Sequence, residues 1–228
     1  MEKLRVKNIS IEITRKCNMS CLHCMRGDAQ NLDIYHSDIR NVLKHIKYIG
    51  HFNITGGEPS LNIKAIRYIL KQLKSFEIEV YEFYIVTNGT KSSISKEFMD
   101  ICSKLYDYQQ KEDMKGSFRL LEMSDDRFHD NTFHHKVIEA FGKYPFAGLR
   151  GQADNIFLFM EGRSQTGSLN HIKPLYLTDN NYLKGDVYLN AEGMILSNGD
   201  LSYRRQEENI LCHSGSFRPY VKYDIEKY

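Results

Sequence analysis

Residues 8–24 of this chain run NISIEITRKCNMSCLHC. Residues 8–14 alternate apolar and polar side chains, which predicts a β-strand. Cys17, Cys21 and Cys24 follow soon after that alternation stops. The stretch therefore predicts a strand that leads directly into a loop carrying three thiols.

Strand-like and helix-like patterns alternate along the rest of the chain. Further strands are expected at 52–55, 79–87, 117–123 and 155–160. Helical spacing occurs over 39–46, with Ser37 as the expected cap, over 66–73, over 98–105, and over 137–141 from a start near Thr132. Strands separated by helices indicate βα units and a parallel sheet. We predict an α/β fold, a partial (β/α)6 TIM-like barrel with a small C-terminal β-hairpin, and chemistry at the strand ends.

The C-terminal part shows a different pattern. Residues 187–189 and 194–196 flank the sequence Asn-Ala-Glu-Gly. This predicts a β-hairpin in which Gly193 is available for a positive φ angle. We expect residues 1–170 to form the barrel core and residues 171–228 to form an extension whose hairpin packs on it.

Composition limits the kinds of partner. The 31 basic and 29 acidic residues give a formal net charge of +2, so no strong field favours nucleic acid or an anionic membrane. The apolar runs are too short to cross a bilayer, and the first residues lack the apolar region of a signal peptide. We therefore expect a cytoplasmic protein that binds neither nucleic acid nor a membrane.

The clustered cysteines favour a metal site over disulfides. A 4Fe–4S cluster usually takes four thiolates, so three would leave one iron open for a ligand. The alternative is structural zinc, which needs four ligands, and His23 lies awkwardly between two of the thiols. Cys102 is on the apolar face of a predicted helix and is expected in the core, and Cys212 is also expected to be structural.

The pattern Cys17-x-x-x-Cys21-x-x-Cys24 directly after a first strand resembles the signature of the radical S-adenosylmethionine (radical SAM) superfamily. The resemblance implies one 4Fe–4S cluster with three cysteine ligands. It also implies that the amino and carboxylate groups of S-adenosylmethionine (AdoMet) bind the fourth iron. His23 occupies the position of the aromatic residue that borders the adenine in that family.

A second motif follows the next predicted strand. Gly56 and Gly57 allow the backbone to approach a ligand closely, and Glu58 adds a carboxylate. The sequence Gly56-Gly57-Glu58-Pro59 resembles the second signature of the family, which binds the AdoMet amino group. The alternative is an ordinary turn in which Pro59 and Ser60 start the following helix.

The ends of two later strands carry further polar residues. The stretch Thr87-Asn88-Gly89-Thr90 resembles the end of the third strand in the family, which lines the active site. A simple turn is the alternative. Ser124 and Asp125 end the fourth predicted strand, where polar residues often contact the AdoMet ribose in family members. Helix capping explains these two residues equally well.

Arg163 follows the fifth predicted strand in a Gly-Arg pair that resembles peptide-modifying members of the family. The resemblance implies that it pairs with the AdoMet carboxylate, and a surface arginine is the alternative. His129 could exchange a proton near neutral pH. We nevertheless expect His129 on the surface, and His134 and His135 still more so.

The resemblance also implies a reaction. A one-electron donor of the flavodoxin or ferredoxin type reduces the cluster, and AdoMet is cleaved to a 5′-deoxyadenosyl radical. The radical abstracts hydrogen from a peptide or small-molecule substrate. It must be shielded from water and oxygen, so the enzyme is expected to be oxygen-sensitive. The sequence identifies no catalytic residue, and two alternatives stay open: an activating enzyme that installs a radical on a partner protein, and a non-enzymatic metal-binding module.

Overall fold

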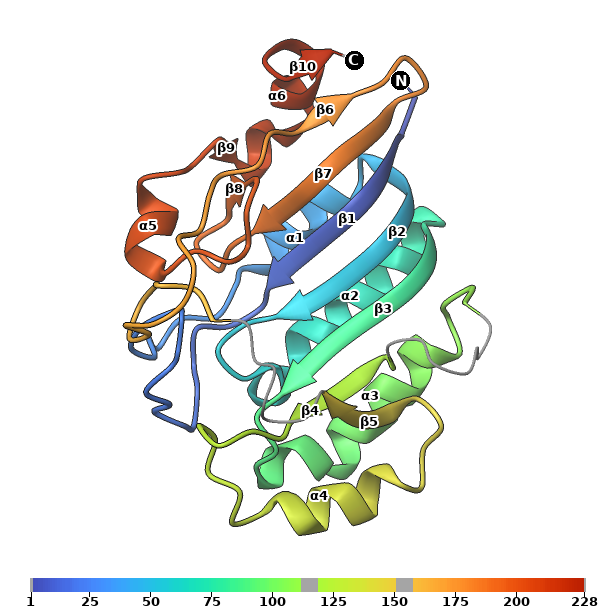
Figure 1. Ribbon diagram of the computed structural model, residues 1–228. Helices are drawn as coiled ribbons and strands as arrows, with labels where there is room; N and C mark the ends of the chain where they lie inside the picture. Colours follow the sequence, from blue (N-terminus) through green and yellow to red (C-terminus); the bar gives the residue numbers. More distant parts are fainter. Residues whose placement is uncertain (1, 112–118, 151–157, 228) are drawn as a thin grey trace.

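The computed structural model describes residues 2–111, 119–150 and 158–227. Strands and helices alternate through most of the chain, and a twisted sheet lies at its centre (Figure 1). The strands are β1 (Leu4–Glu12), β2 (Ile46–Thr55), β3 (Glu79–Thr87), β4 (Leu121–Ser124), β5 (Ala147–Arg150), β6 (Tyr176–Leu177), β7 (Tyr182–Leu189), β8 (Met194–Leu196), β9 (Cys212–His213) and β10 (Glu226–Lys227). The helices are α1 (His36–Leu43), α2 (Ile63–Phe76), α3 (Lys96–Tyr106), α4 (His134–Phe141), α5 (Tyr203–Glu207) and α6 (Phe217–Tyr223).

The sheet has the order β10-β6-β7-β1-β2-β3-β4-β5. All neighbouring pairs from β7 to β5 are parallel, whereas β6 and β8 run antiparallel to β7. In the described part of the chain the outer strands β5 and β10 do not pair with each other, so the barrel is not closed. The prediction of an α/β fold of the partial-barrel type is confirmed.

The two faces of the sheet have different neighbours. Helices α1, α2 and α3 lie behind it, while the other face carries no helix in this view (Figure 1). The apolar side of β1 is fully buried at Ile9 and Ile11, and α2 buries Ile66 and Leu73. The polar side of β1 faces the opposite way, since Asn8 lines a cavity. The alternation in the sequence thus separates a core face from a cavity face.

The predicted C-terminal hairpin is confirmed. Strands β7 and β8 pair through Tyr188 opposite Leu196, and Gly193 in the turn has φ of +80°. The hairpin does not simply pack on the sheet. Strand β7 extends the sheet by pairing with β1, with Ile9 opposite Val187. The division of the chain at residue 170 stays a prediction.

The first predicted helix ends three residues too late. Helix α1 ends at Leu43, and Ile46 begins β2, which is much longer than the predicted run 52–55. Ile46 fits helical spacing from Leu43, but the chain turns at His45, whose carbonyl accepts a hydrogen bond from Leu4 at 2.8 Å. Ser37 lies inside the helix, and the N-cap Tyr35 makes no side-chain capping bond.

The later strands also differ from the prediction. Strand β5 at Ala147–Arg150 pairs with β4 and was not predicted. Half of the predicted strand 155–160 lies outside the described residues, and Phe159 in the remainder forms an isolated bridge to Ser168. Residues 117–118 also lie outside them, and β4 is described from Leu121 to Ser124.

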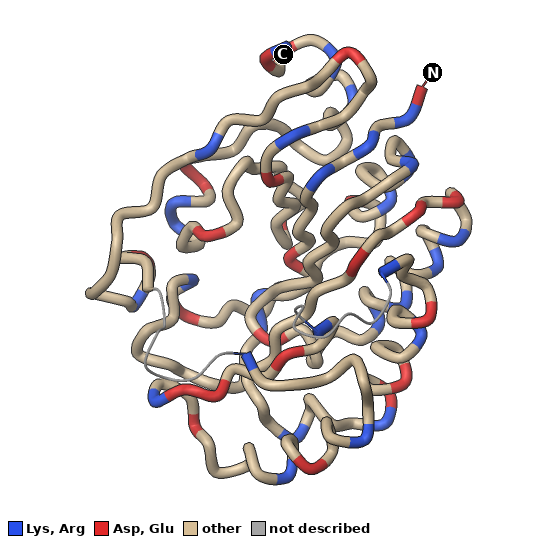
Figure 2. Tube along the Cα trace, turned by 45° about the vertical axis from the view of Figure 1, so that its right-hand side comes forward, with Lys and Arg blue, Asp and Glu red and all other residues tan. Residues whose placement is uncertain are grey.

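Charge is spread over the molecule. Basic and acidic residues are interspersed along the trace, without a large region of one sign (Figure 2). No helix in the described ranges combines the length and apolarity that a membrane crossing requires. The mixed surface agrees with the nearly balanced composition.

Candidate functional site

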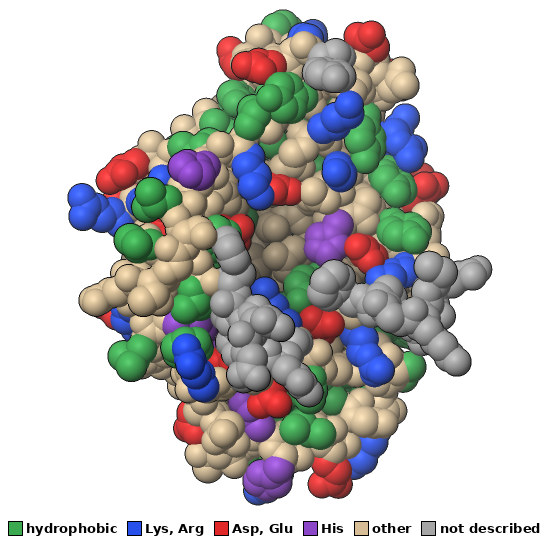
Figure 3. All heavy atoms as spheres, in the orientation of Figure 1, with side chains coloured by type: hydrophobic (Ala, Val, Ile, Leu, Met, Phe, Trp, Pro, Cys, Tyr) green, Lys and Arg blue, Asp and Glu red, His purple; other side chains and the backbone are tan. Residues whose placement is uncertain are grey.

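A large cavity lies on the face of the sheet opposite α1, α2 and α3, where the described residues form no helix. Its volume is about 1020 Å³, and the space-filling view shows this face hollowed near its centre (Figure 3). Residues at the carboxyl ends of three parallel strands line it, namely Thr55, Thr87 and Ser124. This is the edge at which ligands bind in parallel α/β sheets.

The three clustered cysteines line this same cavity. None of them is in a disulfide, and each is partly buried. Burial, together with the neighbouring Cys17 and Cys24, raises the pKa of Cys21 to about 11. Thiols of this kind stay protonated until a metal displaces the proton. Among the described residues, the buried Nδ1 of His23 has no hydrogen-bond partner. The donor set therefore fits a thiolate-bound metal group at this end of the cavity.

The three cysteines lie in residues 15–32, called the cysteine loop below, and backbone hydrogen bonds join the two ends of this loop. The Arg15 N–H donates to Leu32 O at 2.8 Å, and the Gln30 N–H donates to Arg15 O at 3.0 Å. The Thr14 hydroxyl donates to Asp33 Oδ1 at 2.6 Å. These bonds fix the two ends of the loop in place while the cysteines between them face the cavity.

Gly56 and Gly57 lie against the start of the cysteine loop. A Cβ atom on Gly56 would be 2.5 Å from Thr14 O, and one on Gly57 would be 2.3 Å from Lys16 O. The Gly57 N–H donates to Thr14 O, and the Glu58 N–H donates to Lys16 O, both at 2.8 Å. Only glycine permits this approach, so the motif positions the loop as well as bordering the cavity.

The Glu58 carboxylate is buried, with 1% of the residue exposed. Oε1 accepts hydrogen bonds from the Thr87 hydroxyl at 2.8 Å and the Ser60 N–H at 3.0 Å, and Oε2 accepts one from the Asn88 N–H at 2.8 Å. Burial raises the pKa of Glu58, and these hydrogen bonds oppose the rise. Glu58 thus joins the ends of β2 and β3. Pro59 and Ser60 start a short 3₁₀ helix, and α2 begins after it at Ile63.

Asn88 lies against the cysteine loop. Its side-chain amide donates to Asn18 Oδ1 at 2.9 Å and to Cys17 Sγ at 3.7 Å. An amide that donates to sulfur stabilises a thiolate and tunes a metal bound to it. The expected position of Asn88 beside the cavity is found, since Asn88 is one of its lining residues.

Ser124 and Asp125 have different surroundings. Ser124 lines the cavity, whereas Asp125 is not among its described lining residues. Asp125 Oδ1 instead lies 3.1 Å from His134 Nδ1. The expectation of a surface His134 is wrong: this residue is 3% exposed, and its Nε2 lies 3.3 Å from Asn88 O. Polar partners on both ring nitrogens explain its burial. His135 is exposed, as predicted.

The expectation of a surface His129 is also wrong. His129 lines the cavity, and its side chain is 12% exposed. Its Nδ1 lies 2.8 Å from Asp126 Oδ1. His23 stacks on Phe128 with ring centroids 4.5 Å apart and meets the His129 ring edge-on at 5.0 Å. Asp126 was not singled out from the sequence, although its place directly after a strand end was a usable signal.

Arg163 holds the cysteine loop from outside. Its Nε donates to Cys21 O at 3.0 Å, its backbone N–H donates to Cys24 O at 2.9 Å, and its Nη1 lies 2.8 Å from Asp28 Oδ1. Arg163 also lines the cavity. Gly162 before it has φ of +58°, and a Cβ there would be 2.6 Å from Cys24 O. The Gly-Arg pair is therefore shaped to fit the loop.

Residues 11–108 match the family model of the radical SAM superfamily. A probable GTP 3′,8-cyclase from Pyrococcus horikoshii is 30% identical over 89 residues, which are 37% of this chain and 27% of that protein. An uncharacterized protein from Methanocaldococcus jannaschii is 26% identical over 68 residues, which are 28% of this chain and 24% of that one. The matches thus span about a quarter of each of these curated relatives.

Solved structures share the fold. Histidine-tagged anSMEcpe with bound AdoMet superposes with a TM-score of 0.58 at 10% identity, covering 92% of this chain and 78% of that one. Native anSMEcpe with bound AdoMet and the Cp18Cys peptide gives a TM-score of 0.57 at 11% identity, with the same coverage. At this identity the similarity establishes the architecture.

Proposed function

We propose that this chain, whose residues 11–108 match the family model of the radical SAM superfamily, holds one 4Fe–4S cluster through Cys17, Cys21 and Cys24. The cluster and AdoMet would together generate a 5′-deoxyadenosyl radical that abstracts hydrogen from a substrate. The observation that carries this proposal is the convergence of three unpaired thiols on one cavity at the carboxyl edge of the sheet. Three thiolates leave one iron free for AdoMet.

The AdoMet site is proposed along the same edge. We assign Gly56, Gly57 and Glu58 to the amino end of AdoMet, and His23 to the adenine. Asn88 is proposed to line the AdoMet site beside the cysteine thiols. In support, all five residues line the cavity. The stacked His23 and Phe128 rings offer a flat surface of the kind that binds a base.

The remaining predicted contacts to AdoMet are less direct. Ser124 is proposed for the ribose, since it lines the cavity. Asp125 contacts the ribose only if it leaves His134. Asp126 and His129 are better placed than Asp125 to contact the ribose, because both line the cavity. Arg163 is proposed for the AdoMet carboxylate, and its bonds to the cysteine loop would hold it in reach.

The substrate is proposed to lie against the face of the sheet that lines the cavity, beside the cysteine loop. Polar side chains line that part of the cavity, including Ser10, His51, Asn53 and Asp186. His51 Nδ1 lies 2.8 Å from Glu82 Oε1. Such a surface recognises a polar substrate, either a small molecule or a peptide segment. A peptide is bound in one of the structural neighbours.

When bound, the cluster and AdoMet supply reductive cleavage of a carbon–sulfur bond after an electron arrives from a flavodoxin- or ferredoxin-type donor. The chain's own residues would hold the cluster and orient AdoMet, and the radical must be shielded from water and oxygen. We propose on this basis that the enzyme is oxygen-sensitive and works in the cytoplasm.

Anaerobic reconstitution tests the proposal. The full chain is expected to bind about four iron atoms, the content of one 4Fe–4S cluster, and to release 5′-deoxyadenosine from AdoMet under dithionite. Cys21→Ser is expected to lose both properties, and Cys212→Ser is the matched control that keeps them. Full iron loading in Cys21→Ser, or zinc in the anaerobically purified protein, would contradict the ligand assignment.

The activating-enzyme alternative makes a different prediction. It requires a partner protein and leaves a radical on that partner, detectable by electron paramagnetic resonance after turnover. A substrate enzyme consumes a peptide or small molecule and leaves no persistent protein radical.

A further inference from the structure

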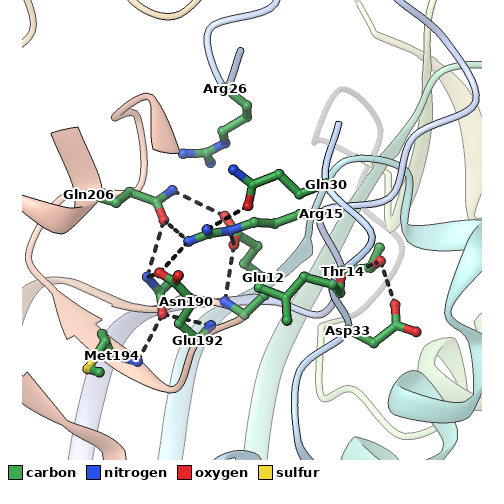
Figure 4. A network of polar contacts seen from close by, with 12 residues as sticks. Glu12, Thr14, Arg15, Arg26, Gln30, Asp33, Asn190, Glu192, Met194 and Gln206 are labelled. Atoms are coloured by element: carbon green, nitrogen blue, oxygen red, sulfur yellow. Dashed lines mark hydrogen bonds and ion pairs between the residues drawn. The ribbon is translucent and has the colours of Figure 1, made fainter. Parts of the chain in front are cut away.

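The cysteine loop is anchored before its first cysteine by Arg15, a side chain only 1% exposed. Arg15 Nη1 donates to Gln30 Oε1 at 2.9 Å, across the base of the loop. Its Nη2 donates to Glu192 Oε2 and to Gln206 Oε1, both at 3.0 Å. One guanidinium therefore bridges both ends of the loop to residues far away in the C-terminal part of the chain (Figure 4).

Glu12 is the anion at the centre of this arrangement and is fully buried. Oε1 accepts from Arg15 Nε at 2.8 Å and from the Ala191 N–H at 3.1 Å. Oε2 accepts from the Tyr188 hydroxyl at 2.6 Å and from Gln206 Nε2 at 3.1 Å. Each carboxylate oxygen of Glu12 thus accepts two hydrogen bonds. Three of the four donors belong to residues 188–206. A buried network satisfied in this way fixes one geometry, and loss of any member leaves a buried charge under-compensated.

The other end of the loop is anchored to the same segment. Arg26 lies two residues after Cys24, and its carbonyl accepts a hydrogen bond from the Tyr203 N–H at 3.1 Å. Its Nη1 donates to Leu201 O at 2.7 Å. Its guanidinium carbon lies 5.1 Å from the centroid of the Tyr188 ring, close enough for a cation–π contact.

From these contacts we infer that residues 188–206 position the cysteine loop for ligand binding, with Gln206 and Tyr188 as the positioning residues. Inside the loop the Cys24 N–H donates to Cys21 O at 3.1 Å, and the contacts of Arg15 and Arg26 described above hold its two ends. The inference rests on the proposed function only in taking the three cysteines as metal ligands. It gives the C-terminal hairpin a role in organising the site.

Amide hydrogen exchange of the metal-free full chain tests the positioning directly. In Gln206→Met, which keeps the volume but removes the hydrogen bonds to Arg15 and Glu12, peptides covering 15–32 are expected to exchange about tenfold faster. The milder variant Tyr188→Phe keeps the ring near Arg26. In this variant the same peptides are expected to exchange about threefold faster. In reconstituted protein, both variants are expected to lose iron faster to a chelator.

Ser214→Ala is the matched control. The Ser214 hydroxyl donates to Asp38 Oδ1 at 2.6 Å, so this change also removes a buried hydrogen bond between the C-terminal part and the core. Ser214→Ala is expected to speed up amide exchange in α1, where Asp38 lies. Exchange of the peptides covering 15–32 is expected to stay at the wild-type rate.

The outcomes separate this inference from the proposed function. Unchanged exchange over 15–32 in Gln206→Met, or an equal acceleration in Ser214→Ala, overturns the positioning role. Should Gln206→Met fail to fold, Tyr188→Phe decides by the same criteria. A wild-type protein that takes up no iron would contradict the proposed function, and the exchange result on the metal-free chain would still decide the positioning role.

Discussion

Gly57 passes so close to Lys16 that a Cβ atom on Gly57 would lie 2.3 Å from the Lys16 carbonyl oxygen. The same oxygen accepts the Glu58 N–H at 2.8 Å. The end of β2 and the start of the cysteine loop therefore form one unit, and a side chain at Gly57 must displace backbone. The motif contributes to the site through its shape as well as its polar groups.

Gly57→Ala should weaken AdoMet binding by about 1–3 kcal/mol, because the added methyl group pushes the loop away from its position. Isothermal titration of the reconstituted variant with AdoMet measures the loss. Gly142→Ala is the control, since Gly142 has a helical φ of −57° and its Cβ would meet no atom closer than 3.5 Å. Equal AdoMet affinity in Gly57→Ala and the wild type would count against the close-approach argument.

Glu58→Gln should lower the free energy of unfolding by about 1–3 kcal/mol. The amide keeps one acceptor oxygen but turns an NH2 group toward donors that now have no acceptor, either those of Thr87 and Ser60 or that of Asn88. Urea unfolding of the metal-free protein measures the change. Glu97→Gln serves for comparison, because that side chain is 69% exposed and its ion pair with Arg67 is worth little. A loss no larger than in Glu97→Gln would show that the buried bonds do not matter.

Arg163→Ala should loosen the cysteine loop, so that backbone amides at residues 17–24 of the metal-free protein exchange about fivefold faster. The reason is the loss of the hydrogen bond from Nε to Cys21 O, which holds the loop against the chain. Hydrogen–deuterium exchange, measured by mass spectrometry on peptides that cover residues 17–24, gives the rate. Asp28→Asn removes only the ion pair with Arg163, whose Asp28 side is 90% exposed, and should leave the rate unchanged. Identical rates in Arg163→Ala and Asp28→Asn would assign Arg163 no role in holding the loop.

The fold was predictable where apolar spacing is regular. Ile9, Ile11 and Ile13 are fully buried on one side of β1 and its extension, as the alternation of that stretch predicts, and Cys102 is buried in the core, as its place on a helix face predicts. The pairing of β1 with β7 was not predictable, because the two strands are separated by most of the chain and the sequence carries no local signal of their contact.

The candidate site was predictable where spacing and glycines carry the signal, as for the cysteines and Gly57. The burial of Arg15 and Glu12 was not, because charged residues that alternate with apolar ones normally face solvent. Here they are buried because residues from the C-terminal part supply donors and acceptors around them. His134 is a parallel case, since its partners Asp125 and Asn88 O come from two different strand ends.

The stability of the metal-free protein should fall in acid through Glu12. Burial acts to raise the pKa of Glu12, but the Arg26 and Arg15 guanidiniums and the Tyr188 hydroxyl outweigh it and hold the pKa below its ordinary value of 4.5. A carboxyl whose pKa is lower in the folded state stabilises the fold above its unfolded pKa, and loses that contribution as pH falls through the folded pKa.

Glu12→Gln should therefore be less stable than the wild type at pH 7, by about 2–4 kcal/mol. This gap in the free energy of unfolding should shrink as pH falls below about 4.5. Urea unfolding from pH 7 to pH 3.5 measures the gap, with the exposed Glu139→Gln expected to show almost none at any pH. A gap that stays constant over this range would mean that the Glu12 carboxylate is not held as an anion by its arginine neighbours.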